Sequence, residues 1–144
     1  MTPTDDAGVL DKSRQEERCY EELLGVYREL VAALADAARP LDRDWLLERH
    51  AAAETVTVRL RALSADLAPR RLGGGPVAPE VAALWRRSAA LAAEASRTNA
   101  DATALARARQ TALLARIAQL NVGRRALASY RPVADVSARV GHRA

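Results

Sequence analysis

The amino acids that build large cores are scarce in this sequence. None of its 144 residues is phenylalanine, and aromatic residues make up 3% of the chain. The hydrophobic share of 49% therefore rests largely on alanine, which has the highest helix propensity but buries little surface. Such a core suits helices packed closely side by side better than a deep globular pocket. Because segments with the two-residue alternation of strands are nearly missing, we predict an all-α fold.

Cysteine is also nearly absent, and there is no long apolar run. The single cysteine, Cys19, excludes an internal disulfide framework and a cysteine-based zinc cluster, and we interpret it as a partly buried apolar residue. Residues 1–18 are acidic and polar, without the basic and apolar regions of a signal peptide. No apolar stretch approaches the length that spans a bilayer. We therefore expect a cytoplasmic protein.

Charge is unevenly distributed, although the net charge is only +4. Up to Glu54 there are thirteen acidic and seven basic residues, whereas from Thr55 onward there are fifteen arginines and five acids. Arginine and alanine at this level are also what a GC-rich genome produces, so the basic character is weak evidence for nucleic-acid binding. The basic half is suited to an acidic partner or to the acidic first helix.

Apolar residues spaced alternately three and four apart predict a first amphipathic helix. We expect residues 1–12 to be a disordered lead-in, because Ser13 and Glu16 fit a capping box at the start of the helix. Pro40 is expected to stop it, since proline disfavours helical geometry in the preceding residue. The predicted apolar stripe consists of Tyr20, Leu24, Tyr27, Val31, Leu34 and Ala38.

A second helix is expected to follow a cap formed by Asp42 or Asp44 and to end at Pro69, in a glycine-rich loop. Its predicted stripe consists of Leu46, Ala53, Val56, Leu60, Leu63 and Leu67.

The third helix is predicted to begin with Pro79 in its first position, and its periodicity continues to Gly123. A helix over 79–121 would be about 65 Å long, against about 38 Å for each of the first two. It would therefore either overhang them or break near Asn99, where a fourth helix could be capped, and we favour the continuous helix.

These elements predict an elongated antiparallel bundle or coiled coil of three helices, with a long third helix. Residues 1–12 form the lead-in, residues 13–122 form the helical bundle domain, and residues 123–144 form a flexible basic tail.

No residue pattern predicts catalysis, a metal or a cofactor, so we do not expect an enzyme. His50 and Glu54 share a helix face but lack the further ligands of a metal site, and their surroundings do not fit a phosphotransfer histidine. Glycines 73–75 lack the strand and lysine of a phosphate-binding loop. Trp45 and Trp85 are expected to plug the ends of the bundle. The arginines of the third helix are not interleaved with stacking aromatic residues, which favours a solvated face or pairing with acids of the first helix.

Several longer segments resemble the flagellar export chaperones of the FlgN class. Residues 30–50, with leucine-rich segments on both sides of a short turn, resemble the first helical hairpin of that family. Residues 94–109 are similar to an asparagine-containing stretch of its long helix, and residues 113–132 resemble its C-terminal end. The resemblance extends over residues 17–132.

The resemblance implies a cytoplasmic chaperone of flagellar type III export. Such a protein holds the C-terminal helices of hook-associated proteins unassembled and delivers them to the export gate. It also implies that the C-terminal amphipathic segment contacts the client and that a tail tyrosine docks at the gate. Tyr130 is the docking candidate. The candidate client-binding residues are Leu113, Ile117, Leu120, Val122 and Leu127.

Two other interpretations stay open at this point. A self-associating structural or regulatory coiled-coil protein would bury the same apolar residues in a symmetric homodimer. A basic helical protein could bind nucleic acid with an affinity that falls steeply as salt is raised. The aliphatic candidates also fit an ordinary bundle core. The chaperone interpretation, by contrast, predicts that apolar residues after about position 105 are exposed.

Overall fold

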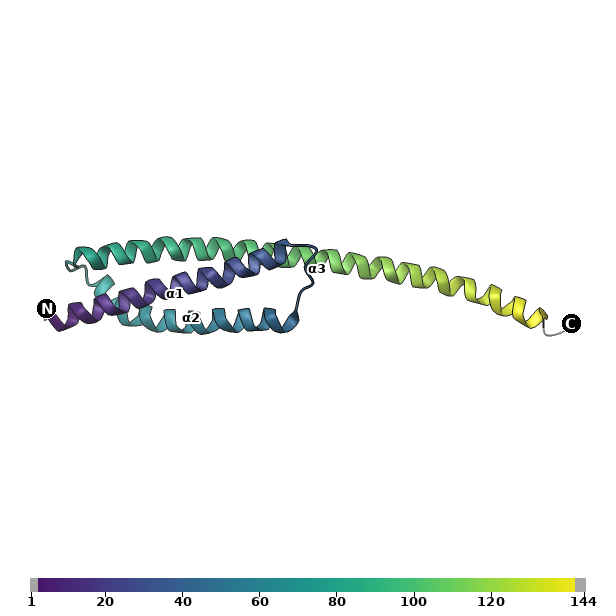
Figure 1. Cartoon of the computed structure of the whole chain (residues 1–144), viewed down its shortest axis with the longest axis horizontal. Coiled ribbons are helices and arrows are strands. Elements are labelled where there is room, and N and C mark those ends of the chain that lie inside the picture. Colours follow the sequence, from purple (N-terminus) through teal and green to yellow (C-terminus); the bar gives the residue numbers. More distant parts are fainter. Residues whose placement is uncertain (1–2, 142–144) are drawn as a thin grey trace. The chain divides into compact units, whose positions relative to one another are not determined.

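The computed structural model describes the backbone of residues 3–141 and the side chains of residues 6–130. Its elements are the three helices α1 (Pro3–Ala35), α2 (Arg43–Leu72) and α3 (Pro79–Gly141) (Figure 1). No strand occurs among the described residues, and the all-α prediction is confirmed. The chain divides into two units, which we call the N-terminal unit (Met1–Leu105) and the C-terminal unit (Ala106–Ala144).

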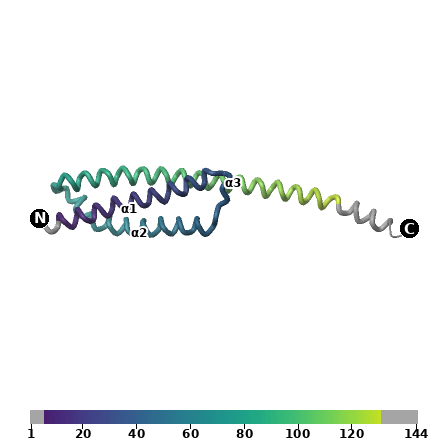
Figure 2. Tube along the Cα trace, viewed as in Figure 1, coloured from purple at the N-terminus to yellow at the C-terminus, as the bar shows by residue number. Residues whose placement is uncertain are grey.

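Within the N-terminal unit, α1 and α2 pack antiparallel to each other. In the first half of α1, Glu16 binds Arg71 close to the end of α2, whereas near the end of α1, Glu29 binds Arg49 close to the start of α2 at 2.9 Å. The short connection at residues 36–42 allows this reversal (Figure 2). The antiparallel hairpin predicted from the two leucine stripes is therefore present.

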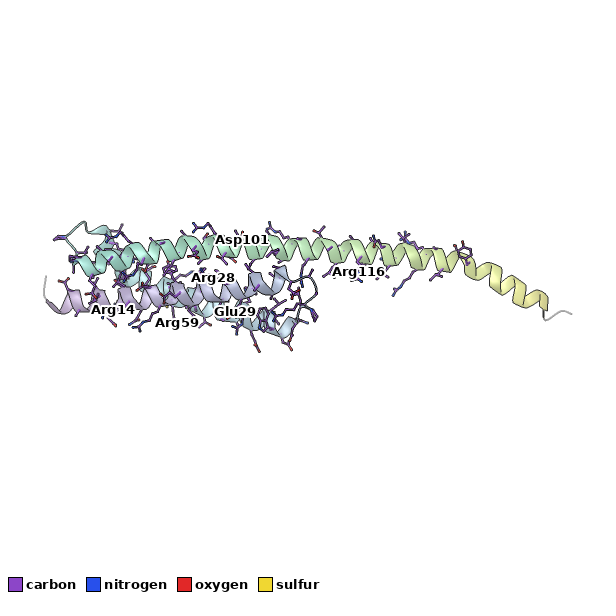
Figure 3. The ribbon with its side chains drawn as sticks, turned by 45° about the horizontal axis from the view of Figure 1, so that its top comes forward. Arg14, Arg28, Glu29, Arg59, Asp101 and Arg116 are labelled. Atoms are coloured by element: carbon purple, nitrogen blue, oxygen red, sulfur yellow. The ribbon has the colours of Figure 1, made fainter. Side chains whose placement is uncertain are left out.

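The first part of α3 lies along α1 in the parallel direction. Arg14 binds Glu80 at 2.7 Å, and Arg28, about four turns further along α1, binds Glu94 further along α3. Arg14, Arg28 and Glu29 are labelled in Figure 3. The N-terminal unit is thus an up-down-up bundle of three helices.

The core of this bundle consists mainly of small and medium-sized aliphatic side chains, as the composition predicts. Burying a valine or leucine completely stabilises the fold by about 1.5–3 kcal/mol. Alanine buries less apolar surface, so a core with many alanines contributes less to stability. The predicted α2 stripe is buried at Ala53, Val56, Leu60 and Leu67. The buried cluster at the centre consists of Cys19, Leu23, Leu24, Val26, Ala53, Val56, Leu60 and Ala95.

The start of α1 differs from the prediction. Residues 3–12 are helical, so the expected lead-in over residues 1–12 is wrong for this range. Ser13 is fully buried inside the helix, and its hydroxyl accepts a hydrogen bond from the Trp85 indole at 2.9 Å. Residues three apart share a helix face, so Ser13 and Glu16 fit a buried polar pair as well as a capping box. Partners distant in the sequence decide between the two.

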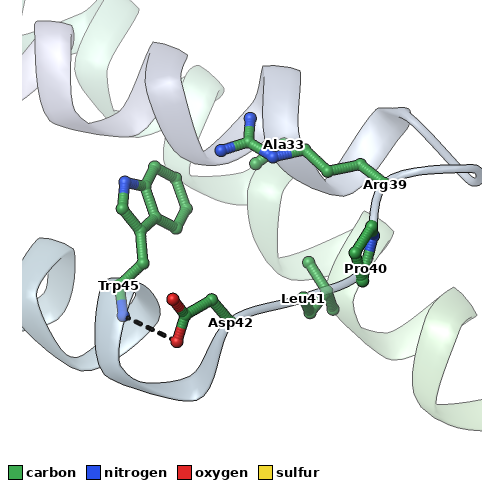
Figure 4. Close-up of a pocket in the computed structure, with 6 residues that line it drawn as sticks. All are labelled: Ala33, Arg39, Pro40, Leu41, Asp42 and Trp45. Atoms are coloured by element: carbon green, nitrogen blue, oxygen red, sulfur yellow. Dashed lines mark hydrogen bonds between the residues drawn. The ribbon is translucent and has the colours of Figure 1, made fainter.

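The start of α2 agrees with one of the two predicted caps. The Asp42 carboxylate accepts hydrogen bonds from the backbone amides of Asp44 at 2.9 Å and Trp45 at 3.4 Å. This satisfies amides that have no partner within the helix. The guanidinium of Arg39 lies 5.1 Å from the centre of the Trp45 ring, which closes the turn over the half-buried tryptophan (Figure 4).

The end of α2 lies beyond the predicted stop. Pro69 is inside the helix, which continues to Leu72, and the Pro69 carbonyl accepts from the Gly73 amide at 3.0 Å. Proline inside a helix removes an amide donor and crowds the carbonyl four residues back, and the ion pair of Arg71 with Glu16 stabilises the last turn against this cost. The chain then leaves the helix through Gly74, whose φ of 63° is unfavourable for residues with a Cβ.

The backbone of α3 is helical across Asn99, where the sequence also allowed a break. The hydroxyl of Thr98 donates to the Glu94 carbonyl at 2.8 Å, and that of Thr103 donates to the Asn99 carbonyl at 2.9 Å. These side chains therefore bond back onto the same helix instead of capping a new one. The expected tail boundary at Gly123 is also wrong, because one glycine costs only about 1 kcal/mol in a helix of strong formers.

The single cysteine offers a probe of this fold. Cys19 is 6% exposed, and burial raises the pKa of its thiol above the ordinary value. Because the thiolate is the reactive form, we expect Ellman's reagent at neutral pH to react at least about 100-fold more slowly with native protein than with urea-unfolded protein. Free cysteine in the same urea concentration controls for the reagent. Rates within a few-fold of each other would contradict the packing of α1.

Candidate partner-binding surface

The candidate client-binding residues all lie on the part of α3 that belongs to the C-terminal unit, and all are exposed. Every described residue from 110 to 130 is exposed. Large aliphatic side chains gathered on one exposed helix are unusual in a folded monomer and are typical of interaction sites. The exposed fractions are 56% for Leu113, 52% for Ile117, 62% for Leu120, 66% for Val122, 72% for Leu127 and 72% for Tyr130.

Three leucines of this segment lie along one line of the helix. Leu113, Leu120 and Leu127 are seven residues apart, which corresponds to almost two full turns with a drift of about 20° per repeat. Ile117 lies between the first two on the same side. We call Leu113, Ile117, Leu120 and Leu127 the leucine stripe.

The remaining two candidates are not part of this line. Val122 is nine residues beyond Leu113, and at about 100° per residue it lies on the opposite side of the helix. Val122 therefore does not share a helix face with Leu113. Tyr130 is three residues beyond Leu127, which places it at the edge of the stripe, about 60° away.

One further exposed leucine, which was not among the predicted residues, lies beside the stripe. Leu114 is 59% exposed and lies three residues before Ile117, so it widens the stripe on one side. The adjacent pair Leu113-Leu114 was the signal for it, since neighbouring apolar residues broaden a helix face.

Charge in the C-terminal unit has one sign around the stripe. The segment 106–130 contains five arginines and no acidic residue, and it would be about 37 Å long as a helix. Arg116, labelled in Figure 3, projects from this part of α3. Arg124 is four residues beyond Leu120 and three before Leu127, a position on the stripe itself.

In the N-terminal unit, by contrast, arginines of the second half pair with acids of α1, as one of the sequence interpretations predicts. The Arg87 side chain donates to Glu17 at 2.8 Å, and Arg59 lies 3.6 Å from Glu22. These pairs are exposed and each contributes little to stability. Together they nevertheless neutralise part of the acidic charge of α1 within the bundle.

A buried polar cluster is the other concentration of functional groups in the N-terminal unit. The Glu16 carboxylate, 1% exposed, accepts two hydrogen bonds from Arg71 and one from Ser64 at 3.4 Å. The Arg71 guanidinium also lies 5.0 Å from the centre of the Trp85 ring. The cluster joins side chains of all three helices and so fixes their packing. Because both oxygens of the Glu16 carboxylate are already hydrogen-bonded, it offers no free base.

A cavity of about 260 Å³ adjoins this cluster, between α1, α2 and α3. The Ser88 hydroxyl that lines it is buried and has no hydrogen-bond partner among the described side chains. Tyr20 lines the same cavity, and burial raises the pKa of its phenol. A single hydroxyl beside a neutral phenol and an occupied ion pair does not form an acid–base or nucleophile pair.

The remaining candidates from the sequence stay isolated. His50 Nε2 lies 3.9 Å from Glu54 Oε1, and both side chains are mostly exposed. Among the described residues there is no group of three or more potential metal ligands. Glycines 73–75 connect α2 to α3 and follow no strand. In the part of the chain that the structure describes, no helix is both long and apolar enough to cross a membrane.

Comparison of the chain with protein-family models, with curated proteins and with solved structures gave no match.

Proposed function

We propose that this protein is a helix-binding chaperone whose leucine stripe receives a helix of a client protein. The observation that carries the proposal is the exposure of Leu113, Ile117, Leu120 and Leu127 on one line of α3. Covering such a stripe with a partner helix removes apolar surface from water, at about 25 cal/mol for each Å² buried. An amphipathic helix is the ligand shape that fits an apolar line along another helix.

The client class comes from the resemblance to export chaperones of the FlgN class. On this basis the clients are hook-associated flagellar proteins, bound through their C-terminal helices in the cytoplasm and delivered to the type III export gate. Tyr130 at the edge of the stripe is the proposed gate-docking residue. Its side chain is 72% exposed in the chain alone, so it is available to a second protein.

The experiment is affinity purification of the intact, tagged chain from its native organism beside two single variants. Leu120→Gln places an amide on the stripe, and Val122→Gln makes a similar change on the opposite side. We expect hook-associated proteins to be recovered with the intact chain and with Val122→Gln, and to fall at least about fivefold with Leu120→Gln, because burying an unpaired amide costs at least about 1 kcal/mol.

A version that ends at Leu105 is the second arm of this experiment. We expect it to lose the client while its circular dichroism at 222 nm still melts cooperatively. Recovery of hook-associated proteins by this version would overturn the assignment of the stripe. Recovery of none by the intact chain would overturn the export-chaperone proposal.

Self-association is the second candidate function, because the seven-residue spacing of Leu113, Leu120 and Leu127 is also that of a coiled-coil seam. Two copies could then cover each other's stripes in a symmetric dimer. Sedimentation equilibrium of the intact chain separates the candidates: a dimer that Leu120→Gln dissociates supports self-association, and a monomer supports a client.

A further inference from the structure

The charge of the chain is separated between its two units. Residues 1–105 contain 17 acidic and 14 basic residues, whereas residues 106–144 contain one acidic and eight basic residues. The positive excess is therefore carried by the unit with the leucine stripe. Any segment that docks there approaches a strongly positive helix, which attracts acidic partners and repels basic ones.

The arginines are placed where a partner helix would meet them. In a helix pair with Leu113, Leu120 and Leu127 at one seam position of each heptad, Ile117 and Arg124 take the other seam position. Arg116, one residue before Ile117, flanks the seam. Arg125 lies about 100° around the helix from Arg124 and faces away from the seam.

Arg124 sets the strongest requirement on the partner. A guanidinium covered by another helix loses its water, and this cost is recovered only by a well-placed anionic partner. The planar fork of arginine is suited to a carboxylate, which it binds through two parallel hydrogen bonds. The partner should therefore present Asp or Glu opposite Arg124.

A second copy of this chain does not meet that requirement. A parallel dimer along the stripe places Arg124 against its own equivalent. In an antiparallel dimer that pairs the two stripes over residues 106–130, no register places a carboxylate opposite Arg124, because this segment contains none. Two of the α1 acids of another copy are already engaged: Glu16 binds Arg71, and Glu17 binds Arg87.

We propose that the segment that docks on the leucine stripe is an acidic amphipathic helix of another protein, with carboxylates bordering its apolar face and one carboxylate opposite Arg124. This inference rests on the proposed helix-binding function and specifies the chemistry of the client helix. Charge attraction speeds its approach, and the pairing at Arg124 fixes its register along the stripe.

Binding of three synthetic helical peptides to the full chain tests the inference. The peptides share the same apolar seam residues and carry Glu, Gln or Lys at the bordering positions and opposite Arg124. Fluorescence anisotropy in about 50 mM salt should show the Glu peptide binding at least about tenfold more tightly than the Lys peptide. The difference should shrink in about 500 mM salt, where charges are screened within a few ångströms.

Two charge-reversal variants with the same net charge distinguish a specific ion pair at Arg124 from general attraction between the positive helix and an acidic peptide. Arg124→Glu should weaken the Glu peptide about tenfold and strengthen the Lys peptide, because it replaces the ion pair by repulsion between neighbouring carboxylates. Arg125→Glu, which faces away, should change either affinity only about twofold. Circular dichroism of both variants controls for loss of helix.

The outcomes distinguish this inference from the function on which it rests. If all three peptides bind equally, or if both reversals act equally, the stripe binds helices but the acidic partner and the role of Arg124 are overturned. If no peptide binds, the helix-binding function itself is overturned. Sedimentation of the chain alone as a dimer that competes with the Glu peptide would assign the stripe to a second copy and overturn the inference.

Discussion

Replacing Arg71 with methionine should lower the free energy of unfolding by about 3 kcal/mol. The change removes the cation from a nearly fully buried Glu16 carboxylate and leaves Ser64 as its remaining hydrogen-bond partner. It also removes the guanidinium from the face of Trp85. Methionine keeps much of the volume of arginine and is a good helix former, so the loss reports mainly on the uncompensated charge. Urea denaturation followed by circular dichroism measures it.

A matched control and a rescue make this prediction specific. Arg59→Met breaks the exposed pair with Glu22 and should cost no more than about 1 kcal/mol. The double variant Glu16→Met with Arg71→Met should recover at least half of the loss, since an apolar pair of similar volume replaces a buried ion pair well. A loss for Arg71→Met no larger than for Arg59→Met would show that Glu16 is hydrated.

The second large effect is expected at Leu67. This side chain is 1% exposed in a core with few large residues, so Leu67→Ala should lower the free energy of unfolding by about 3 kcal/mol, through lost burial and the cavity that remains. A small domain has about 5–15 kcal/mol in total, so this is a substantial fraction. The midpoint of urea denaturation should fall accordingly, with an unchanged slope.

Leu72→Ala is the control for this effect because it makes the same chemical change five residues later on α2. Leu72 is 86% exposed, and its loss should change stability by no more than about 0.5 kcal/mol. If both variants behave alike, the end of α2 does not pack against the bundle as described.

The fold could be predicted where the spacing of apolar residues within one helix determines which of its faces is buried. Of the six residues in the stripe predicted for α2, Ala53, Val56, Leu60 and Leu67 are buried, whereas Leu46 and Leu63 are half-buried. The spacing is a local property, and burial of one helix face follows from it directly. The choice between Asp42 and Asp44 as the cap depends on the backbone geometry at the helix start, because both residues precede the same helix.

Prediction failed where contacts distant in the sequence override a local signal. Ser13 and Glu16 formed a plausible cap, but Trp85 and Arg71 bind them inside a helix that begins ten residues earlier. Pro69 was a plausible stop, yet the ion pair next to it holds one further turn. A pattern read from neighbouring residues alone contains no information on such partners.

The candidate surface shows the same division. The six residues were chosen from their positions near the C-terminal end of α3, and their exposure could not be read from the sequence because an apolar stripe is equally typical of a bundle core. The place of Val122, by contrast, is a matter of spacing alone. A helical period of 3.6 residues puts it opposite Leu113, whatever the rest of the chain does.

The pairings of α1 with α2 and with α3 also imply an order of folding during synthesis. Contacts between α1 and α2 join residues that are 20 positions apart at Glu29–Arg49 and 55 apart at Glu16–Arg71, so this hairpin can close progressively from its turn. Contacts between α1 and α3 offer no such start, because their separations lie between 66 and 72 residues. Closing shorter loops costs less entropy. Because α3 is synthesised last, we expect the α1–α2 hairpin to form first and α3 to dock on it afterwards, starting from the Arg71–Trp85 contact next to the α2–α3 connection.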